Sequence, residues 1–235
     1  MQELLRVGVG ARTAVAVVTE RIDGDMNLQR VDLDTLQRRQ RRLTGATWVM
    51  IDEVHGTDVV DLDRLPAGNG SPAGVGDVLV ADRGTDRLAV WAADCAPVAL
   101  FGANGTSRVV AHCGWRGLAA GVLDVAVDAL ESKGTTVAAA VLGPCIQCCC
   151  YEFGDLERRA VARGVGAPPE LITGRTAWGT TALDVPAAVV AGLARRRVTL
   201  DVVGSCTGCD QRFHSHRRRA QPQRHALVAW FEETS

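Results

Sequence analysis

Three residues that bind metals well each stand at the end of a short apolar run. His55, Cys95 and His112 all follow segments typical of buried strands, and a fold gathers the ends of such strands at one rim. Two imidazoles and a thiolate form a tetrahedral zinc site with one position left for water or substrate, which is typical of catalytic zinc. The adjacent Asp94 would accept a proton or support a ligand. The alternative is that both histidines are ordinary hydrogen-bonded residues and Cys95 is a small buried hydrophobe.

A glycine-rich segment in the middle of the chain is suited to binding an anion. Residues 113–117 read Cys-Gly-Trp-Arg-Gly, and a helix is expected over 118–132. Glycine lets the backbone approach a ligand closely, Arg116 adds a fixed positive charge, and the N–H groups that follow Gly117 would point at the ligand. The segment is neither a Walker loop nor a dinucleotide fingerprint. It predicts a phosphate or oxyanion site, and the alternative is a turn that packs Trp115 in the core.

The chain contains 8 cysteines, and we expect it in the reducing cytoplasm, where disulfides are rare. Two Cys-x-x-Cys pairs, Cys145/Cys148 and Cys206/Cys209, predict either a four-cysteine zinc site or a redox pair. The third interpretation is that these thiols are buried and bind nothing.

The segment 213–218 combines two histidines with a basic triplet. His214 and His216 would point the same way if this segment were a strand. A metal role for the histidines, an anion-binding role for Arg217 and a plain basic surface loop are the three interpretations.

Short apolar strands alternate irregularly with helices along the chain. Helices are expected at residues 33–43, 118–132, 155–163 and 183–197. Strands are expected at 12–20, 47–52, 58–61, 77–81, 88–93, 96–101, 108–111, 136–142, 198–203 and 226–230, and 65–76 has the composition of a loop. Several strands follow one another without a helix, which favours mixed over parallel sheets. We therefore predict an α/β (α+β) sandwich fold with mixed β-sheets, and a chain of this length could form one domain or two small ones.

The composition argues against several classes of protein. A formal net charge of −1 offers no global attraction to nucleic acid or to an anionic membrane, and an aromatic content of 4% is low for a base-stacking surface. The first ten residues lack the pattern of a secretory signal. No apolar run reaches the roughly 18–20 residues that span a bilayer. We expect a cytoplasmic enzyme with small-molecule partners, no nucleic acid and no membrane.

Seven segments, in this order, resemble the YfiH family, also called the laccase-domain or polyphenol-oxidase family and more recently purine nucleoside phosphorylases. They are 54–56 (VHG), 76–80 (GDVLV), 93–98 (ADCAPV), 111–118 (AHCGWRGL), 142–152 (LGPCIQCCCYE), 206–207 (CT) and 213–218 (FHSHRR). The resemblance implies a single α/β domain over residues 1–235, in which stacked mixed β-sheets are flanked by helices. It also implies a metal site at His55, Cys95 and His112. Glu53 stands where the family usually has glutamine, which puts a carboxylate near the metal.

The resemblance also implies an activity. Family members split purine nucleosides (adenosine, inosine, guanosine and methylthioadenosine) with phosphate into base and ribose 1-phosphate, and they deaminate adenosine. The implied partners are therefore purine nucleosides and phosphate, with zinc favoured over copper as the metal. Arg116, Gly117 and Arg217 would hold the phosphate. Tyr151 would line the base pocket, and Asn27 matches a family binding position. We expect a monomer or a weak homodimer.

Three other functions remain open from the sequence. A cysteine hydrolase or amidase would use Cys95 as nucleophile and His112 as base. A copper-dependent polyphenol oxidase would need more histidine ligands than this site offers. A non-enzymatic binding module would leave an open three-residue metal site without a use.

Overall fold

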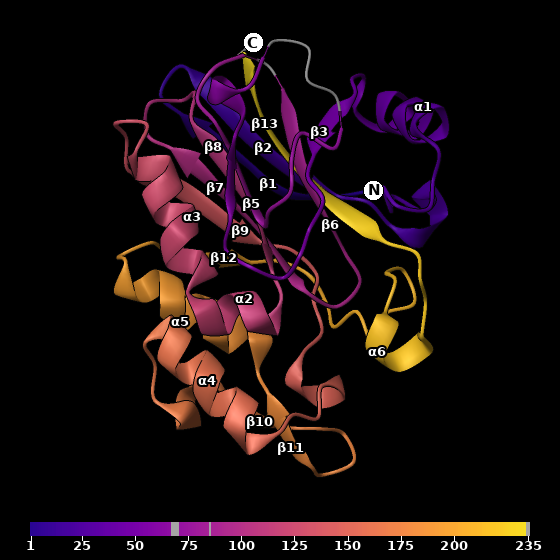
Figure 1. The fold of residues 1–235 in the computed structure, drawn as a ribbon, viewed down its shortest axis with the longest axis vertical. Helices are drawn as coiled ribbons and strands as arrows, with labels where there is room; N and C mark the ends of the chain where they lie inside the picture. The colour runs from indigo at the N-terminus through magenta and orange to yellow at the C-terminus, as the bar shows by residue number, and fades with distance from the viewer. Residues whose placement is uncertain (67–70, 85, 234–235) are drawn as a thin grey trace.

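Two mixed β-sheets form the centre of the computed structural model, which describes residues 1–66, 71–84 and 86–233 (Figure 1). One sheet has the strand order β1 (Gln2–Val9), β2 (Arg12–Val18), β13 (His225–Glu233), β6 (Arg87–Ala92) and β3 (Trp48–Met50). The other has the order β12 (Asp201–Val202), β9 (Val137–Leu142), β7 (Ala96–Gly102), β8 (Arg108–Cys113), β5 (Val78–Ala81) and β4 (Val59–Asp61). Within them, the pairs β3/β6, β4/β5 and β9/β12 are parallel and the others antiparallel. This confirms the predicted fold class.

The two sheets share one hydrophobic core and each has a second core on its outer face. Along β5, Leu79 packs between the sheets, whereas Val78 and Val80 face the helices on the other side, as the period of two along a strand requires. Phe101 of the six-stranded sheet and Phe231 of the five-stranded sheet meet between them, with ring centroids 5.3 Å apart. Strands that are buried on both faces are apolar throughout, which is why these runs are recognisable in the sequence.

Helices cover the outer faces of both sheets (Figure 1). α1 (Leu33–Thr44) packs Leu36 into the outer core of the five-stranded sheet. On the opposite side, α2 (Trp115–Ala120), α3 (Val122–Glu131) and α5 (Val185–Arg195) contact the six-stranded sheet, and α4 (Asp155–Val165) packs on α2 and α5. The short α6 (His216–Arg219) and a hairpin of β10 (Thr173–Arg175) and β11 (Thr181–Leu183) complete the fold. In the described part of the chain, no helix has the length and apolar character needed to cross a membrane.

Several elements differ from the prediction. The helix expected over 118–132 is two helices, because Gly121 has a φ of 89° and ends α2 in a left-handed turn. The strand expected at 198–203 contains only Asp201–Val202. β1 was not predicted, since a register shift between Glu3 and Leu5 breaks its alternation, and the β10–β11 hairpin was missed as well. The loop predicted at 65–76 includes residues 67–70, which lie outside the described residues.

Candidate active site

The ligand atoms of His55, Cys95 and His112 lie within 4.8 Å of one another. His55 stands in the loop after β3, Cys95 in the turn between β6 and β7, and His112 in β8. Because Pro97 of β7 pairs with His112, the pairing of these strands brings Cys95 beside that imidazole. The structure thus brings the three residues together, although His112 belongs to its strand instead of following it.

Asp77, directly before β5, holds two parts of this site in place. Its Oδ1 lies 2.8 Å from Nδ1 of His112 and accepts a 2.9 Å hydrogen bond from the backbone N–H of His55. Its Oδ2 accepts a 2.6 Å bond from the N–H of Gly56. These bonds stabilise the loop at His55, whose φ of 61° is uncommon for a residue other than glycine. With Nδ1 held by a carboxylate, Nε2 of His112 is left for a metal, as in many zinc sites.

The charges around Asp77 and Cys95 favour their ionised forms. Burial acts to raise the pKa of Asp77, but the bonds from His112 and the N–H of Gly56 outweigh burial and lower it. Burial also acts to raise the pKa of Cys95, yet the neighbouring imidazoles of His112 and His55 lower it to about 6. A thiolate is the form of cysteine that binds a metal or attacks carbon.

The imidazole of His112 favours its protonated form in the absence of a metal. Burial acts to lower the pKa of His112, but the negative charges of Glu53 and Cys95, together with the bond to Asp77, raise it well above its ordinary value. Because the thiolate and the imidazole sit side by side, each stabilises the charge of the other. A metal would take the place of that proton.

Gly114 makes the close approach of the ligands possible. A Cβ at this position would lie 2.8 Å from Cδ2 of His55 and 3.4 Å from Sγ of Cys95. A distance of 2.8 Å is below van der Waals contact, so any larger residue here would push the imidazole away from the thiol.

Glu53 adds a buried carboxylate beside the same atoms. Its Oε1 accepts a 2.7 Å hydrogen bond from the backbone N–H of Trp91, and its Oε2 lies 3.7 Å from Nε2 of His112. Burial raises the pKa of Glu53 to about 8, although the charge of His112 and the bond from Trp91 oppose this in part. Glu53 is therefore placed to hold or release a proton next to the atoms that would bind a metal.

A cavity of about 310 Å³ opens onto this group, near the lower end of the volumes typical of ligand pockets. Its wall includes eight of the nine predicted site residues: Asn27, His55, Asp94, Cys95, His112, Arg116, Tyr151 and Arg217. Segments from six different parts of the chain therefore meet at one concave surface.

Two guanidinium groups in the cavity wall lie over aromatic rings. Cζ of Arg116 is 4.5 Å from the ring centroid of Trp115, and Cζ of Arg217 is 4.6 Å from that of Tyr151. Such stacking restricts the flexible arginine side chains and keeps their charge at the cavity. The cavity wall therefore carries positive charge, which would attract an anion bound next to the metal-binding side chains.

Asp94 connects the cavity wall to the C-terminal segment. Its Oδ1 accepts a 2.6 Å hydrogen bond from the hydroxyl of Thr207, and its Oδ2 accepts a 2.6 Å bond from the backbone N–H of Arg217. One oxygen therefore holds the turn at Thr207, and the other holds the start of α6 against the cavity. The role of Asp94 as a proton acceptor in catalysis stays a prediction.

Gly117 is the one predicted site residue that does not line the cavity. Gly114 caps α2, so the helix begins at Trp115 and Gly117 lies within its first turn. A Cβ at Gly117 would lie 3.0 Å from the carbonyl oxygen of Gly56. Gly117 therefore packs against the loop that carries His55, and its predicted role in binding substrate stays a prediction.

The four-cysteine group of the structure differs from the predicted one. It consists of Cys149, Cys150, Cys206 and Cys209. The side chain of Cys145 is buried in the core between the six-stranded sheet and the helices. Cys148 points toward Gly174, and a Cβ built on Gly174 would lie 2.4 Å from Cβ of Cys148. The short 3-10 helix Cys148–Cys150 turns these consecutive side chains in different directions.

The two histidines of segment 213–218 lie in different surroundings. His216 begins α6 and lines the cavity. His214 is buried and stacks on His225, with ring centroids 6.3 Å apart. The condition for both side chains to point the same way, a strand, is therefore not met, and the two histidines do not form a metal pair.

Some site residues were missed. Asp77 directly precedes an apolar run, and a search for polar residues at both ends of such runs would find it. Gln29, Trp91 and Arg224 also line the cavity, but no local pattern distinguishes them, because only the fold brings them to the wall.

Comparison with known proteins gives consistent matches. A family model described as multi-copper polyphenol oxidoreductase laccase matches residues 25–232. The chain is 37% identical over 188 residues to a purine nucleoside phosphorylase of Streptomyces coelicolor, covering 78% of this chain and 75% of the relative. It is 30% identical over 214 residues to a purine nucleoside phosphorylase of Pseudomonas aeruginosa, covering 86% and 83%.

Solved structures share the whole fold. YlmD from Geobacillus stearothermophilus aligns with a TM-score of 0.80 and 26% identity, covering 99% of this chain and 97% of that one. The YfiH protein of Bacillus licheniformis aligns with a TM-score of 0.79 over the same shares; its 21% identity supports likeness of fold alone.

Proposed function

Because this chain belongs to the laccase-domain family that includes the YfiH proteins, we propose that it is a zinc-dependent purine nucleoside phosphorylase that also deaminates adenosine. One observation carries the proposal. Two stacked arginines, Arg116 and Arg217, share a cavity with a group of two imidazoles and a thiolate. An anion subsite beside a metal subsite fits a reaction between phosphate and an uncharged nucleoside.

The donor set fits zinc. Two histidines and a cysteine are the ligands zinc prefers at sites that keep an open position, and Asp77 orients one of the imidazoles. When bound by His55, Cys95 and His112, zinc would supply a Lewis acid and an activated water.

In phosphorolysis, an oxygen of phosphate forms a bond to C1′ of the ribose while the bond from C1′ to the purine nitrogen breaks. The electron pair goes to the purine, which takes up a proton, and the products are free base and ribose 1-phosphate. Arg116 and Arg217 would bind the phosphate and hold it in line with C1′. Tyr151 and Trp115, on which these arginines stack, would contact the ribose and the flat face of the base.

In deamination, water adds to C6 of adenine and ammonia leaves. Such reactions need a carboxylate next to the metal that moves the proton from water to the leaving amine. We assign this role to Glu53, and its support is that Oε2 of Glu53 lies 3.7 Å from Nε2 of His112.

The test is a product screen on one zinc-loaded preparation. Inosine with phosphate should give hypoxanthine and ribose 1-phosphate, and adenosine without phosphate should give inosine. Cys95→Ala should abolish both reactions, while Cys148→Ser, which changes a thiol outside the cavity, should keep them. The proposal is wrong if no base is released or if the Cys95→Ala variant reacts at the original rate.

A second candidate function is a cysteine hydrolase. The lowered pKa of Cys95, next to the imidazole of His112, is the observation that favours it. In that case, metal-free protein would be active and an alkylating reagent that labels Cys95 would stop turnover. Zinc-dependent phosphorolysis predicts the opposite, because metal-free protein would be inactive.

A multicopper oxidase has less support. The chain contains 5 histidines, and two of them, His214 and His225, are buried away from the cavity. Centres with several copper ions need many imidazole ligands, and too few are within reach here.

A further inference from the structure

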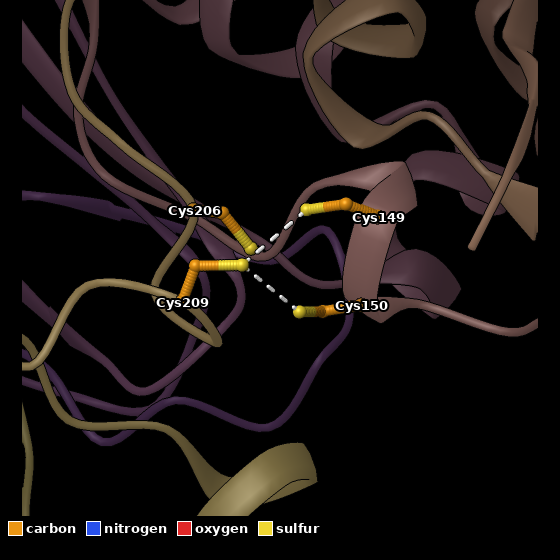
Figure 2. A group of neighbouring side chains, drawn as sticks. All are labelled: Cys149, Cys150, Cys206 and Cys209. Carbon is orange, nitrogen blue, oxygen red and sulfur yellow. Dashed lines mark hydrogen bonds between the residues drawn. The ribbon is translucent and has the colours of Figure 1, made fainter. Parts of the chain in front are cut away.

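A second group of metal-binding side chains lies away from the cavity trio. Cys149 and Cys150 come from the segment after β9, and Cys206 and Cys209 from the segment after β12. Their four sulfur atoms lie within 4.8 Å of one another, and Figure 2 shows the side chains pointing to a common centre. We call Cys149, Cys150, Cys206 and Cys209 the cysteine cluster.

The spacing of the sulfurs fits one tetrahedral ion. A zinc–sulfur distance of about 2.3 Å places the sulfurs of a tetrahedral site roughly 3.8 Å apart. Sγ of Cys209 lies 3.6 Å from that of Cys149 and 3.3 Å from that of Cys150. These two separations are therefore already close to the one that a bound ion would impose.

Disulfide bonds explain this arrangement less well. A disulfide joins two sulfurs at about 2.05 Å, whereas Cys209 faces two thiols at similar distances and all four cysteines of the group are free. One ion would engage all four sulfurs together, and one disulfide would leave two of them over.

The backbone around the cluster is shaped for close approach. The N–H groups of Cys209 and Asp210 both donate to the carbonyl of Cys206, which forms the tight turn 206–210. A Cβ at Gly208 would lie 2.8 Å from Cβ of Cys150, so only glycine lets this turn come so near the opposite cysteines.

Other groups around the cluster would stabilise sulfur ligands. The backbone N–H of Gln147 donates to Sγ of Cys206 at 3.3 Å, and such hydrogen bonds orient the ligands of metal sites. The guanidinium of Arg219 donates to the carbonyls of Thr207 and Gly208 at 2.8 and 3.0 Å. Its positive charge would offset part of the net charge of −2 that zinc with four thiolates carries.

We propose that the cysteine cluster binds a structural zinc ion that joins the two loops. The four thiols give up their protons to solvent on binding, and no oxidation is involved. Closed four-cysteine sites stabilise structure and leave no position for substrate. Cys150 directly precedes Tyr151, and Cys209 lies eight residues before Arg217. The ion would therefore fix the two segments that present the stacked pair of Tyr151 and Arg217 to the cavity.

The first experiment counts the metal while the cavity trio is disabled. A His55→Ala/His112→Ala variant, purified in reductant and loaded with zinc, should retain one zinc per chain. Its X-ray absorption spectrum at the zinc edge should show four sulfur neighbours. Substitution of cobalt for zinc should give intense sulfur-to-cobalt charge-transfer absorption. A variant that holds no zinc, or one that binds iron instead, would overturn the proposal.

The second experiment removes the cluster and keeps the cavity trio. Cys149→Ser/Cys209→Ser should lower the zinc content by one per chain, and its midpoint of thermal unfolding should be lower than that of the original protein. A chelator that strips zinc from the cluster should lower the midpoint of the original protein but not that of the double variant. Cys148→Ser, which alters the neighbouring cysteine outside the cluster, is the matched control and should keep both ions.

If the double variant fails to fold, the metal count of the His55→Ala/His112→Ala variant still decides. If the His55→Ala/His112→Ala variant holds no metal and its mass is two hydrogens below that of the fully reduced chain, the cluster forms a disulfide and the proposal is overturned.

Discussion

Nδ1 of His112 lies 2.8 Å from Oδ1 of Asp77, and the same carboxylate binds the backbone of the loop that carries His55. One buried side chain thus sets the orientation of one proposed ligand and the position of another. The distance between β8 and the β3–β4 loop is therefore fixed before a metal binds. Metal binding then has to order fewer side chains and less backbone.

Asp77→Asn should weaken zinc binding at the cavity. Asparagine keeps the size of the side chain but loses its charge and presents an N–H₂ group to one of its partners. Loss of such supporting carboxylates costs about 10- to 100-fold in metal affinity, measurable by competition with a chelating dye. Asp82→Asn, which alters a carboxylate bonded to Ser107 at the far end of β5, should leave the affinity unchanged. Equal affinities for the Asp77→Asn variant and the original protein would contradict this role.

Gly114→Ala should remove metal from the cavity without unfolding the protein. The φ of Gly114 is −70°, so alanine fits the backbone there. The new methyl group would lie 2.8 Å from the ring of His55 and push it away from Cys95. Gly8→Ala, which meets nothing within 4 Å, is the control. Gly114→Ala should contain less zinc than Gly8→Ala, while circular dichroism should show that both variants are folded. A full complement of zinc in Gly114→Ala would show that the site does not depend on the close approach of His55 to Gly114.

Arg217→Ala should raise the KM for phosphate more than it changes the KM for inosine. A hydrogen bond to a charged group contributes about 1.5–3 kcal/mol, so a loss of roughly 10- to 100-fold in apparent phosphate affinity is expected. Arg116→Ala should act in the same direction. Arg41→Ala, on the exposed side of α1, should change neither value. If phosphate saturates both cavity variants at the original concentration, these arginines do not form the anion subsite.

Acid should destabilise the protein through His225. Burial, with some help from the charge of His214, lowers the pKa of His225 to about 3, whereas an unfolded histidine titrates near pH 6.5. Between these values the unfolded chain binds a proton that the folded chain does not. The free energy of unfolding should therefore fall as the pH drops below about 6.5, by about 1 kcal/mol per pH unit from this residue.

Denaturant unfolding between pH 6.5 and 5.0 tests this dependence. His225→Phe should flatten the slope even if it changes the absolute stability. Val228→Ala, a neighbouring core substitution on β13 without a titrating group, should lower stability and keep the slope. Parallel curves for His225→Phe and the original protein would show that another group carries the effect.

The apolar runs of the sequence predict the two sheets and the convergence of His55, Cys95 and His112, because strands buried on both faces leave a continuous signal. The supporting residues are harder to predict. Asp77 acts through its contacts with two distant segments, and Arg224 reaches the cavity only because β13 inserts between β2 and β6. The spacing of Cys145 and Cys148 suggested a ligand pair, but a short 3-10 helix turns Cys149 and Cys150 toward the partners. Local spacing cannot reveal which way consecutive side chains point in such a turn.

The central place of β13 has a consequence for synthesis on the ribosome. β2 and β6 are made early, yet each bonds along one edge to residues 225–233, which are made more than a hundred residues after β6. Until then both strands expose unpaired edges, which are prone to pair with other chains. The five-stranded sheet can therefore close only after this segment is translated, and until then one edge of each of these two strands is open to mispairing.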